Sequence, residues 1–396
     1  MKGRDAELPA MRVLGLMSGT SLDGVDAVLA RLHWQRGELS WEVQERSSAP
    51  YSPELRERLL QAIKVDSSDV VLLTQLHAEV GRVYAELAAQ VQAGQPLDLI
   101  ALSGQTVYHI PRRDEARGWR TVSTLQLGEA ALSAERCRVP VLTDFRQADL
   151  AAGGQGAPMV AFGDLLLYHR PGVARAVHNL GGISNLTYLP ADGDAERVLA
   201  FDTGPGNCLL DEAASRHFGI PCDEGGRLAA AGRVDEELLE RLLTHPYFRL
   251  YPPKTTGRET FSYQTLAREL EVAGLDPRAI IATLTALTAE SVARAYRDFV
   301  LPLGVDEVLA AGGGTRNDTL MAMLRGRLPV AIRSFDQLGW RAKDREALAF
   351  AVLGYFAYHR RVNTLPRATG ARHPVVAGKL CLPPPGSPRQ YRREQK

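Results

Sequence analysis

The 396-residue sequence lacks the features that mark several large classes of protein. With 47 basic and 46 acidic residues its formal net charge is +1, so it has none of the basic excess typical of nucleic-acid and membrane-surface proteins. No run approaches the ~18 apolar residues of a membrane span, and residues 1–17 contain no apolar signal-peptide core. We therefore expect a cytoplasmic protein without nucleic-acid or membrane partners.

Cysteine is scarce and unpatterned. The four cysteines are Cys137, Cys208, Cys222 and Cys381, and no two of them have CxxC spacing. This argues against a zinc site and favours free thiols in a reducing compartment. Hydrophobic residues make up 45% of the chain and charged residues 23%, so a sizeable core forms without disulfides or a metal.

Two common nucleotide-binding motifs are also missing. There is no GxxxxGK[ST], which argues against a P-loop NTPase. No GxGxxG opens a helix after the first predicted strand, which argues against a Rossmann dinucleotide site.

What the sequence does contain is an alternation of strand and helix patterns. In the first part, apolar patterning predicts strands at 11–17, 25–34, 37–49, 98–104 and 139–145, and helices at 52–64, 68–93 and 124–137. In the second part it predicts two strands around a glycine turn within 173–190, a strand at 197–207, helices at 206–219, 279–300 and 346–361, and a strand followed by a helix within 306–328.

The two parts are alike in outline, since each begins with strands around a glycine-containing turn, MSGTSLDG and NLGGISN. This predicts an α/β protein of two similar domains, a possible product of duplication. The predicted boundaries are 11–145 for the N-terminal domain and 146–355 for the C-terminal domain, with 356–380 packing back on the first domain and 1–10 and 382–396 as disordered ends.

Four glycine-rich loops lie at predicted strand ends: SGTSLDG (18–24), AAGGQGAP (151–158), FDTGPGN (201–207) and AAGGGTRND (310–318). Each alone is explained as a turn, because glycine adopts positive φ without strain. Together they favour phosphate binding by backbone N–H groups, and the triple glycine opens a helix whose N-terminus suits a nucleotide. The combination suggests the ATPase architecture of sugar kinases, actin and Hsp70, in which ATP lies in a cleft between two α/β domains.

Six segments, in chain order, resemble anhydro-N-acetylmuramic acid kinase: GLMSGTSLDGVDAVL, TDFRQADLAAGGQGAPMV, HNLGGISNLTYL, FDTGPGNCLLD, PPKTTGRETF and AAGGGTRNDTLM. The resemblance runs from about residue 12 to residue 375. It implies a kinase that uses ATP and Mg²⁺ to hydrolyse the 1,6-anhydro ring of 1,6-anhydro-N-acetylmuramic acid and phosphorylate O6. The products are N-acetylmuramic acid 6-phosphate and ADP, and the role is peptidoglycan recycling.

The resemblance also implies site residues. Asp202 matches the family's catalytic base, and Asp23 is expected to hold Mg²⁺ through water. The implied ATP-binding residues are Ser18, Gly19, Thr20, Ser21, Leu22, Asp23, Gly24, Val25, Gly204, Gly206, Asn207, Gly312, Gly313 and Gly314. The implied sugar-binding residues are Gln105, Arg146, Asp149, Gln155 and Glu346.

Several of these residues also have a purely structural interpretation. Asp202 and Asp23 are typical turn-capping residues. Arg146 is explained equally by a salt bridge within its domain, and Gln155 by a loop-stabilising amide. Glu346 has the pattern of an exposed first-turn glutamate that the helix dipole favours.

The sequence departs from the family at two positions. Ser103 stands where the family usually has a histidine before Gly-Gln-Thr, and Ala347 where it often has glycine. These changes put the substrate preference in question, not the reaction type. A kinase of the same fold for another sugar, or an actin-like assembly protein, are the alternatives, and the resemblance is compatible with a homodimer.

Overall fold

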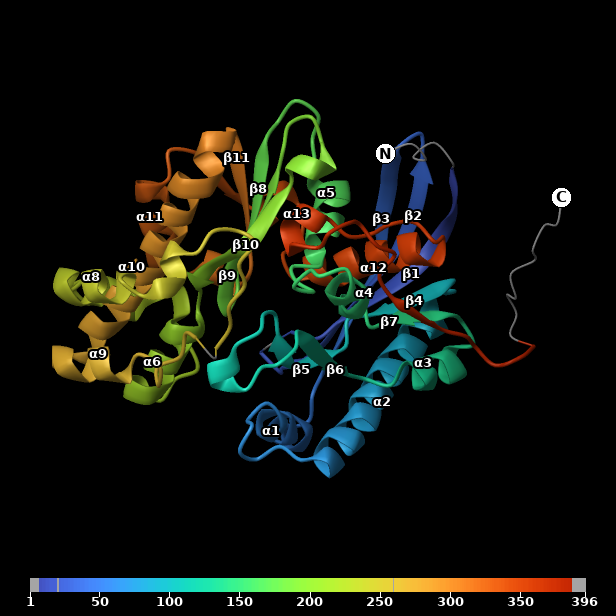
Figure 1. Cartoon of the computed structure of the whole chain (residues 1–396), viewed down its shortest axis with the longest axis horizontal. Helices are drawn as coiled ribbons and strands as arrows, with labels where there is room; N and C mark the ends of the chain where they lie inside the picture. Colours follow the sequence, from blue (N-terminus) through green and yellow to red (C-terminus); the bar gives the residue numbers. More distant parts are fainter. Residues whose placement is uncertain (1–6, 20, 259, 387–396) are drawn as a thin grey trace. The chain divides into compact units, whose positions relative to one another are not determined.

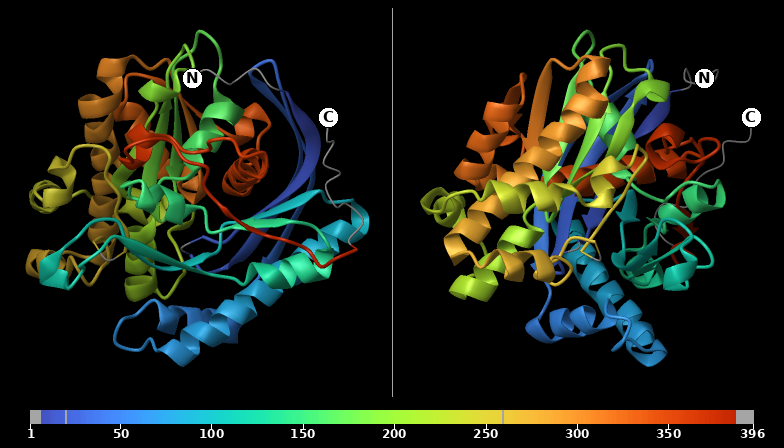
Figure 2. Two further views of the ribbon diagram at one scale, coloured as in Figure 1. Left: turned by 45° about the vertical axis from the view of Figure 1, so that its right-hand side comes forward. Right: turned by 60° about the vertical axis from the view of Figure 1, so that its left-hand side comes forward.

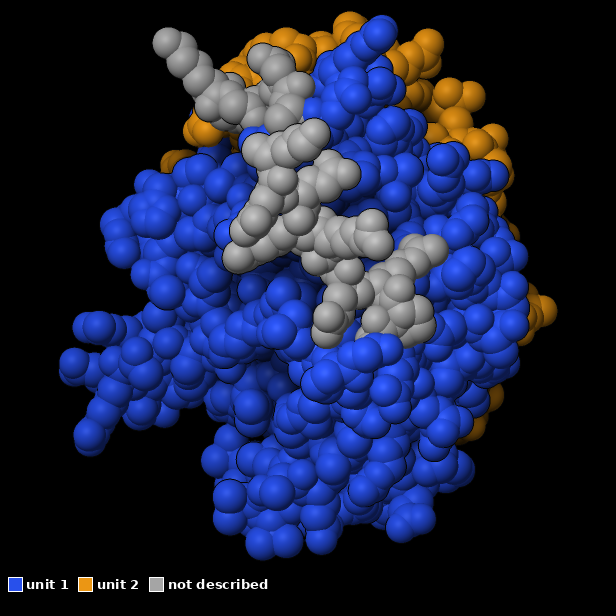
Figure 3. All heavy atoms as spheres, turned by 90° about the vertical axis from the view of Figure 1, so that its right-hand side faces the viewer, with its two compact units in different colours: residues 1–167, 343–396 blue, residues 168–342 orange. Residues whose placement is uncertain are grey.

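The computed structural model describes residues 7–19, 21–258 and 260–386, and the chain divides into two compact units (Figure 1). Unit 1 comprises residues 1–167 and 343–396, and unit 2 comprises residues 168–342 (Figure 3). Each unit is described by itself below.

Unit 1 contains most of the long strands. Its strands are β1 (Leu8–Met17), β2 (Gly24–Gln35), β3 (Glu38–Pro50), β4 (Leu99–Leu102), β5 (Gln105–Ile110), β6 (Ser123–Leu127), β7 (Val141–Thr143) and β13 (Lys379–Cys381). Its helices are α1 (Pro53–Ala62), α2 (Val70–Gly94), α3 (Ala130–Cys137), α4 (Arg146–Ala151), α5 (Val160–Tyr168), α12 (Asp344–Tyr358) and α13 (Pro366–Thr369), with a 3₁₀ turn η1 (Glu115–Arg117).

Unit 2 has shorter strands and more helices. Its strands are β8 (Arg175–Leu180), β9 (Ile183–Leu189), β10 (Leu199–Pro205), β11 (Glu307–Ala311) and β12 (Ala331–Ser334). Its α-helices are α6 (Cys208–Phe218), α7 (Arg227–Ala231), α8 (Glu236–Leu243), α9 (Ala267–Ala273), α10 (Pro277–Ala295) and α11 (Asp318–Arg327). Its short turns are η2 (Ala195–Arg197), η3 (Glu224–Gly226), η4 (Pro246–Arg249), the π-helical η5 (Tyr296–Val300), η6 (Leu301–Leu303), η7 (Gly313–Arg316) and η8 (Asp336–Leu338).

Each unit has its own sheet, and the two sheets have the same topology. The unit 1 sheet has the order β13-β7-β4-β1-β2-β3 and the unit 2 sheet the order β10-β9-β8-β11-β12. In each, the first three strands form an antiparallel meander and the next two run parallel to the first, with β13 added antiparallel in unit 1. The prediction of two similar α/β domains is therefore confirmed. Figure 2 shows β1–β3 as long curved strands, drawn in blue.

Alternating side chains of β1 point to the two faces of the unit 1 sheet. Leu14 and Leu16 are fully buried in a core that includes side chains of α1 and α2. Gly15, between them, faces α12, where an added Cβ would lie 1.9 Å from the Ala347 carbonyl oxygen. Since strand side chains alternate with period two, α12 covers the face opposite α2.

The helix starts follow the sequence signals. The Ser52 hydroxyl accepts a hydrogen bond from the Leu55 N–H, and Pro53 occupies the first turn of α1. The Asp69 carboxylate likewise accepts from the Leu72 N–H at the start of α2. Most long predicted elements are present within a few residues of their expected bounds.

The division between the units falls at 167/168 and at 342/343, whereas the sequence placed it at 145/146 and at 355/356. The physical reason is close packing. A Cβ at Gly163 of α5 would lie 2.7 Å from the Ala349 side chain of α12, and α12 itself packs on β1. The segments 146–167 and 343–355 therefore belong to unit 1.

Two local predictions are wrong, and a third element is helical as predicted but changes its helix type. Residues 124–137 are not one helix, because Gly128 at φ +123° separates β6, which pairs with β5, from α3. The helix predicted over 279–300 leaves α-geometry at Tyr296 for a π-helical turn. The expectation of a disordered start fails for residues 8–10, which begin β1: Leu8 is buried, and its carbonyl oxygen accepts from the Tyr355 hydroxyl.

None of the helices in the described residues combines enough length with enough apolar character to cross a bilayer.

Candidate active site

The loop between β1 and β2 is tied into the core of unit 1 through Ser18. The Ser18 side chain is 4% exposed, and its hydroxyl hydrogen-bonds with the Tyr51 hydroxyl at 2.9 Å and the Tyr84 hydroxyl at 2.6 Å. Its backbone N–H donates to the Ser103 hydroxyl at 3.1 Å. Burial raises the pKa of Tyr84 to about 12, so this phenol is neutral. Ser18 therefore anchors the loop with its hydroxyl.

Gln105, predicted to contact the sugar, lies in the same support. It is fully buried, its amide donates to the Gly19 carbonyl at 3.1 Å, and its amide oxygen accepts from the Tyr51 hydroxyl at 3.3 Å. Ser103, which replaces the family's usual histidine, also takes part through its bond to Ser18. Ser103 and Gln105 of the SGQT segment thus both support the loop after β1.

The two terminal glycines of the loop have different surroundings. A Cβ at Gly24 (φ +152°) would lie 2.3 Å from the Ala49 carbonyl oxygen, so glycine is required by the packing of β2 on β3. A Cβ at Gly19 would meet nothing closer than the Ser21 hydroxyl at 3.5 Å. The loop is therefore open at Gly19, where a phosphate oxygen could approach the backbone.

Other predicted members of this loop fall into three groups. Leu22 and Val25 are buried apolar side chains, so only their backbone could meet a phosphate. The Ser21 hydroxyl donates to the Asp23 carboxylate at 2.8 Å, an arrangement that both a turn and a polar ligand site can use. Thr20 lies outside the described residues.

Asp149 holds the DFRQADLAAGGQGAP segment of unit 1 together. It is fully buried, and its carboxylate accepts from the Gly156 N–H at 2.8 Å and from the Thr369 hydroxyl at 2.7 Å. The Gln155 N–H donates to the Thr369 carbonyl at 2.8 Å, and Arg146 Nη1 donates to the Gly156 carbonyl at 2.7 Å. Arg146, Asp149 and Gln155 are thus brought together, with Asp149 shaping the loop.

Glu346, in the first turn of α12, lies near Arg146. Burial raises the pKa of the Glu346 carboxyl, Arg345 and Arg146 oppose this, and the carboxylates of Asp164 and Asp26 add to it. Glu346 is therefore a partly buried carboxyl surrounded by both positive and negative side chains. It is not the exposed first-turn glutamate that a purely structural role would predict. Unit 1 therefore brings Asp149 and Glu346 within electrostatic reach of the Arg146 guanidinium, whereas Gln105 contacts the loop after β1.

Two predicted loops of unit 2 pack closely. The Gly206 N–H donates to the Gly182 carbonyl at 2.9 Å, and the Asn207 N–H donates to the Gly181 carbonyl at 2.8 Å. The Asn207 side-chain amide donates to the Leu180 carbonyl at 3.0 Å. A Cβ at Gly206 would lie 2.2 Å from the Gly181 oxygen, so the GPGN and NLGG turns meet backbone to backbone.

The triple glycine after β11 joins this pair of loops. A Cβ at Gly312 would lie 2.6 Å from the Asn179 side chain, and one at Gly314 would lie 2.8 Å from the Leu180 side chain. At Gly313 the nearest atom would be the Asn207 amide nitrogen, at 3.7 Å. The structure therefore brings Gly206, Asn207 and the triple glycine together and leaves space around Gly313. Gly204 is not part of this group, since a Cβ there would meet Phe248 at 2.9 Å and Ser291 at 3.2 Å.

Asp202 sits in β10 at an irregularity of the sheet, where pairing with β9 shifts before Gly204. Its N–H donates to the Lys254 carbonyl at 3.0 Å, and its carbonyl accepts from the Tyr247 hydroxyl at 2.7 Å. One carboxylate oxygen, Oδ2, accepts from the Thr256 N–H at 2.8 Å. Two backbone contacts thus fix the position of Asp202, and one contact to Oδ2 orients its carboxylate, as a general base requires.

Sequence reasoning missed the residues that support these sites. The PPKTTGRETF segment was singled out, yet neither Lys254 nor Thr256 was assigned a role. Tyr51, Tyr84 and Tyr247 were also missed, and no local signal could have found them, because each meets its partner across more than 30 residues.

The acidic residues near the loop after β1 bear on how Mg²⁺ could be held. In the described part of the chain no three His, Cys, Asp or Glu side chains gather as potential ligands. Asp26, close to Asp23, is already paired with Lys343 Nζ at 2.7 Å. The remaining carboxylate, Asp23, fits an Mg²⁺ that keeps most of its waters and is carried by nucleotide phosphates.

Known proteins resemble the chain over nearly its full length. The sequence profile of the family described as anhydro-N-acetylmuramic acid kinase matches residues 11–383. A curated anhydro-N-acetylmuramic acid kinase of Caldanaerobacter subterraneus subsp. tengcongensis is 41% identical over 382 residues, which cover 93% of this chain and 96% of the relative. That of Bacillus thuringiensis subsp. konkukian is 38% identical over 384 residues, covering 94% and 100%.

Among solved structures, the chain resembles an activator of the 2-hydroxyisocaproyl-CoA dehydratase from Clostridium difficile with bound ADPNP. The TM-score is 0.42 at 13% identity, covering 87% of this chain and 94% of that one.

The profile match covers nearly the whole chain, and the two curated relatives are 41% and 38% identical to it. The chain belongs to the anhydro-N-acetylmuramic acid kinase family and is a kinase.

Proposed function

We propose that the protein converts 1,6-anhydro-N-acetylmuramic acid, water and ATP into N-acetylmuramic acid 6-phosphate and ADP. The family membership supports the substrate class and the use of ATP. The observation that carries the proposed mechanism is the Asp202 carboxylate, which the Thr256 N–H holds where the pairing of β10 with β9 shifts, before Gly204. In the cell this reaction recycles cell-wall fragments in the cytoplasm, where ATP is available.

The reaction needs one proton acceptor. Water attacks the anomeric carbon, its proton passes to the Asp202 carboxylate, and the bond from that carbon to O6 breaks. O6 then takes the γ-phosphoryl group of ATP, ADP leaves, and Asp202 returns its proton to solvent. General-base assistance of this kind contributes about 10²- to 10⁴-fold in rate.

Phosphoryl transfer depends on positioning and charge more than on covalent help. The open backbone at Gly19 in unit 1 and at Gly313 in unit 2 supports phosphate and nucleotide contacts at these two glycines. Asp23 would hold Mg²⁺ through water, and the ion would supply positive charge to the phosphate oxygens. Leu22 and Val25 enter the proposal through their backbone, since their side chains are buried. Asn207 enters it as a residue that shapes the nucleotide loop, since its N–H and its side-chain amide are both already hydrogen-bonded.

Arg146 is the proposed partner of the lactyl carboxylate of the sugar, because a guanidinium binds carboxylates in bidentate fashion. Its Nη1 bond to the Gly156 carbonyl fixes the side chain, and Asp149 fixes Gly156. Glu346 lies near the same guanidinium and is proposed to contact the sugar. Gln155 completes the loop, and a homodimer remains compatible with the proposal.

The test is turnover with purified protein, Mg²⁺–ATP and the anhydro sugar, followed by mass spectrometry of the product. The proposal expects a mass gain equal to one phosphoryl group (HPO₃) and one water, with one ADP for each product molecule. Glucose and N-acetylglucosamine serve as matched substrates. Turnover of either with none of the anhydro sugar would support the alternative of a kinase for another sugar, and ATP-dependent light scattering without product would support the assembly protein.

A further inference from the structure

Lys254 is a buried cation in unit 2 that the mechanism above does not use. It is 5% exposed and lies in the segment between η4 and α9. Its ammonium nitrogen lies 4.9 Å from the ring centre of Tyr247, 5.4 Å from that of Phe299 and 5.7 Å from that of Phe201. These distances allow cation–π attraction to all three rings. An apolar side chain would fill the same space without the cost of removing a charge from water, so the charge itself calls for a role.

The segment that carries Lys254 is fastened at both ends to the elements around Asp202. At its start, the Lys254 carbonyl accepts from the Asp202 N–H, and the Thr256 N–H donates to Asp202 Oδ2. Phe201, the residue before Asp202 in β10, forms one wall of the ammonium's surroundings. The Lys254 ammonium and the Asp202 carboxylate are therefore carried by two backbone segments that hydrogen bonds join directly.

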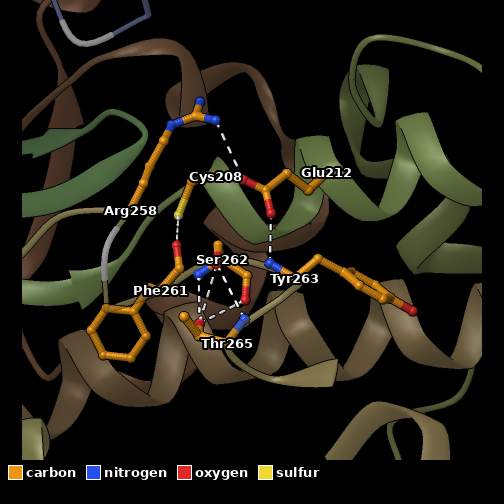
Figure 4. A network of polar contacts seen from close by, with 7 residues as sticks. All are labelled: Cys208, Glu212, Arg258, Phe261, Ser262, Tyr263 and Thr265. Carbon is orange, nitrogen blue, oxygen red and sulfur yellow. Dashed lines mark hydrogen bonds and ion pairs between the residues drawn. The ribbon is translucent and has the colours of Figure 1, made fainter. Parts of the chain in front are cut away.

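At its other end the segment is fastened to α6, the helix that follows the GPGN loop (Figure 4). Arg258 Nη1 lies 3.3 Å from the Glu212 carboxylate, whose second oxygen accepts from the Tyr263 N–H at 2.5 Å. The Cys208 thiol donates to the Phe261 carbonyl at 3.5 Å. Lys254 and Thr256 thus contact β10, and Arg258, Phe261 and Tyr263 contact α6.

Three titratable groups face the ammonium, each from a different element. Asp202 comes from β10, Asp298 from η5 and the Tyr247 phenol from η4. Burial lowers the pKa of Lys254 to about 8, while the Asp298 and Asp202 carboxylates oppose that shift. At neutral pH the side chain therefore stays mostly protonated and places a positive charge within electrostatic reach of Asp202.

We propose that Lys254 is a positioning residue for Asp202: its backbone holds the aspartate, and its buried ammonium favours the ionised carboxylate that a base must have. The inference rests on the proposed function in that it assigns Asp202 the role of base. The electrostatic coupling between the Lys254 ammonium and the Asp202 carboxylate is present without substrate, so it can be measured in the free protein.

The coupling between two charged groups is mutual, so it can be measured from the lysine side. The chain has only six lysines, which makes a spectrum of ¹³Cε-labelled lysine simple to assign with a Lys254→Met reference sample. We expect the Lys254 signal of the wild type to titrate near pH 8 and that of Asp202→Asn to titrate about one pH unit lower, because a carboxylate that favours the ammonium has gone. An exposed control, Asp192→Asn, should leave the midpoint unchanged. The same midpoint in Asp202→Asn as in the wild type overturns the proposal.

The kinetic counterpart compares Lys254→Met with Lys254→Arg in profiles of kcat/KM against pH. Loss of the cation should move the acidic limb of the Lys254→Met profile to a pH about one unit higher. At pH values below that limb kcat/KM should fall roughly tenfold, and on the plateau it should change little. Lys254→Arg should keep the wild-type limb. A lower plateau with an unmoved limb would mean a merely structural role and would overturn the proposal. If the wild type does not turn over the anhydro sugar, the proposed function fails, and the lysine titration still decides the coupling.

Discussion

Replacing Asp202 by asparagine separates the chemistry of the proposed base from its structural contacts. The amide oxygen of asparagine can still accept from the Thr256 N–H, now 2.8 Å from Oδ2. The other two contacts, from the Tyr247 hydroxyl and to the Lys254 carbonyl, use the backbone and are untouched. We therefore expect a folded protein whose unfolding free energy changes by about 1 kcal/mol at most, the difference between a charged and a neutral hydrogen bond.

The catalytic effect of the same change should be far larger. Loss of a general base corresponds to about 10²- to 10⁴-fold in kcat, or about 3–5 kcal/mol in the barrier. Steady-state ADP release with the anhydro sugar measures kcat, and calorimetric titration with an ATP analogue measures nucleotide affinity. We expect kcat to fall into that range and the affinity to stay within threefold. Asp192→Asn, an exposed aspartate of the same unit paired with Arg197, is the matched control. A kcat of Asp202→Asn within threefold of wild type would refute the assignment of the base.

Two further predictions concern the glycine loop and a buried carboxyl. Gly24→Ala should destabilise the protein by about 2 kcal/mol or more in a denaturant melt, because the new Cβ would lie 2.3 Å from the Ala49 carbonyl at φ +152°. Gly19→Ala should leave the melt unchanged and weaken ATP binding about tenfold by blocking the backbone; equal losses of stability in both variants would contradict this. Burial raises the pKa of Asp211 from 3.8 to about 6, so the folded state holds its proton more tightly and the unfolding free energy falls as the pH rises through that window. Asp211→Asn should remove a fall of about 1 kcal/mol, reduced by partial solvent exposure, and parallel stability–pH curves for the two proteins would refute it.

Elements with strong local patterns were predictable. The strands β1 and β2 and the helix α2 follow from apolar periodicity, and the start of α1 follows from Ser52 and Pro53. The similarity of the two halves was inferred from their glycine turns. In the structure it corresponds to an equivalent strand order in the two sheets. The break at Gly128, whose positive φ separates β6 from α3, could not be predicted from local patterns. The residues beside this glycine do not distinguish a break from a continuous helix.

The sequence predicted which segments form the site, but it did not predict which way each polar side chain points. Asp149 and Gln105 were expected to face the sugar, yet both are fully buried and bind nearby backbone. A motif cannot distinguish these two uses of a polar side chain, since the partners that decide it come from elsewhere. Thr369, which binds Asp149, follows it by 220 residues, and Lys254 lies far from Asp202 in the chain.

The central claim is that one active site couples hydrolysis of the anhydro ring to phosphorylation of O6. It is tested most directly by running the reaction with Mg²⁺–ATP and the anhydro sugar in ¹⁸O-labelled water and locating the label by mass spectrometry. The account predicts one ¹⁸O at the anomeric oxygen of a 6-phosphorylated product and none in its phosphate. A 6-phosphorylated product with ¹⁸O in the phosphate, or release of ADP with an intact anhydro ring, would contradict it.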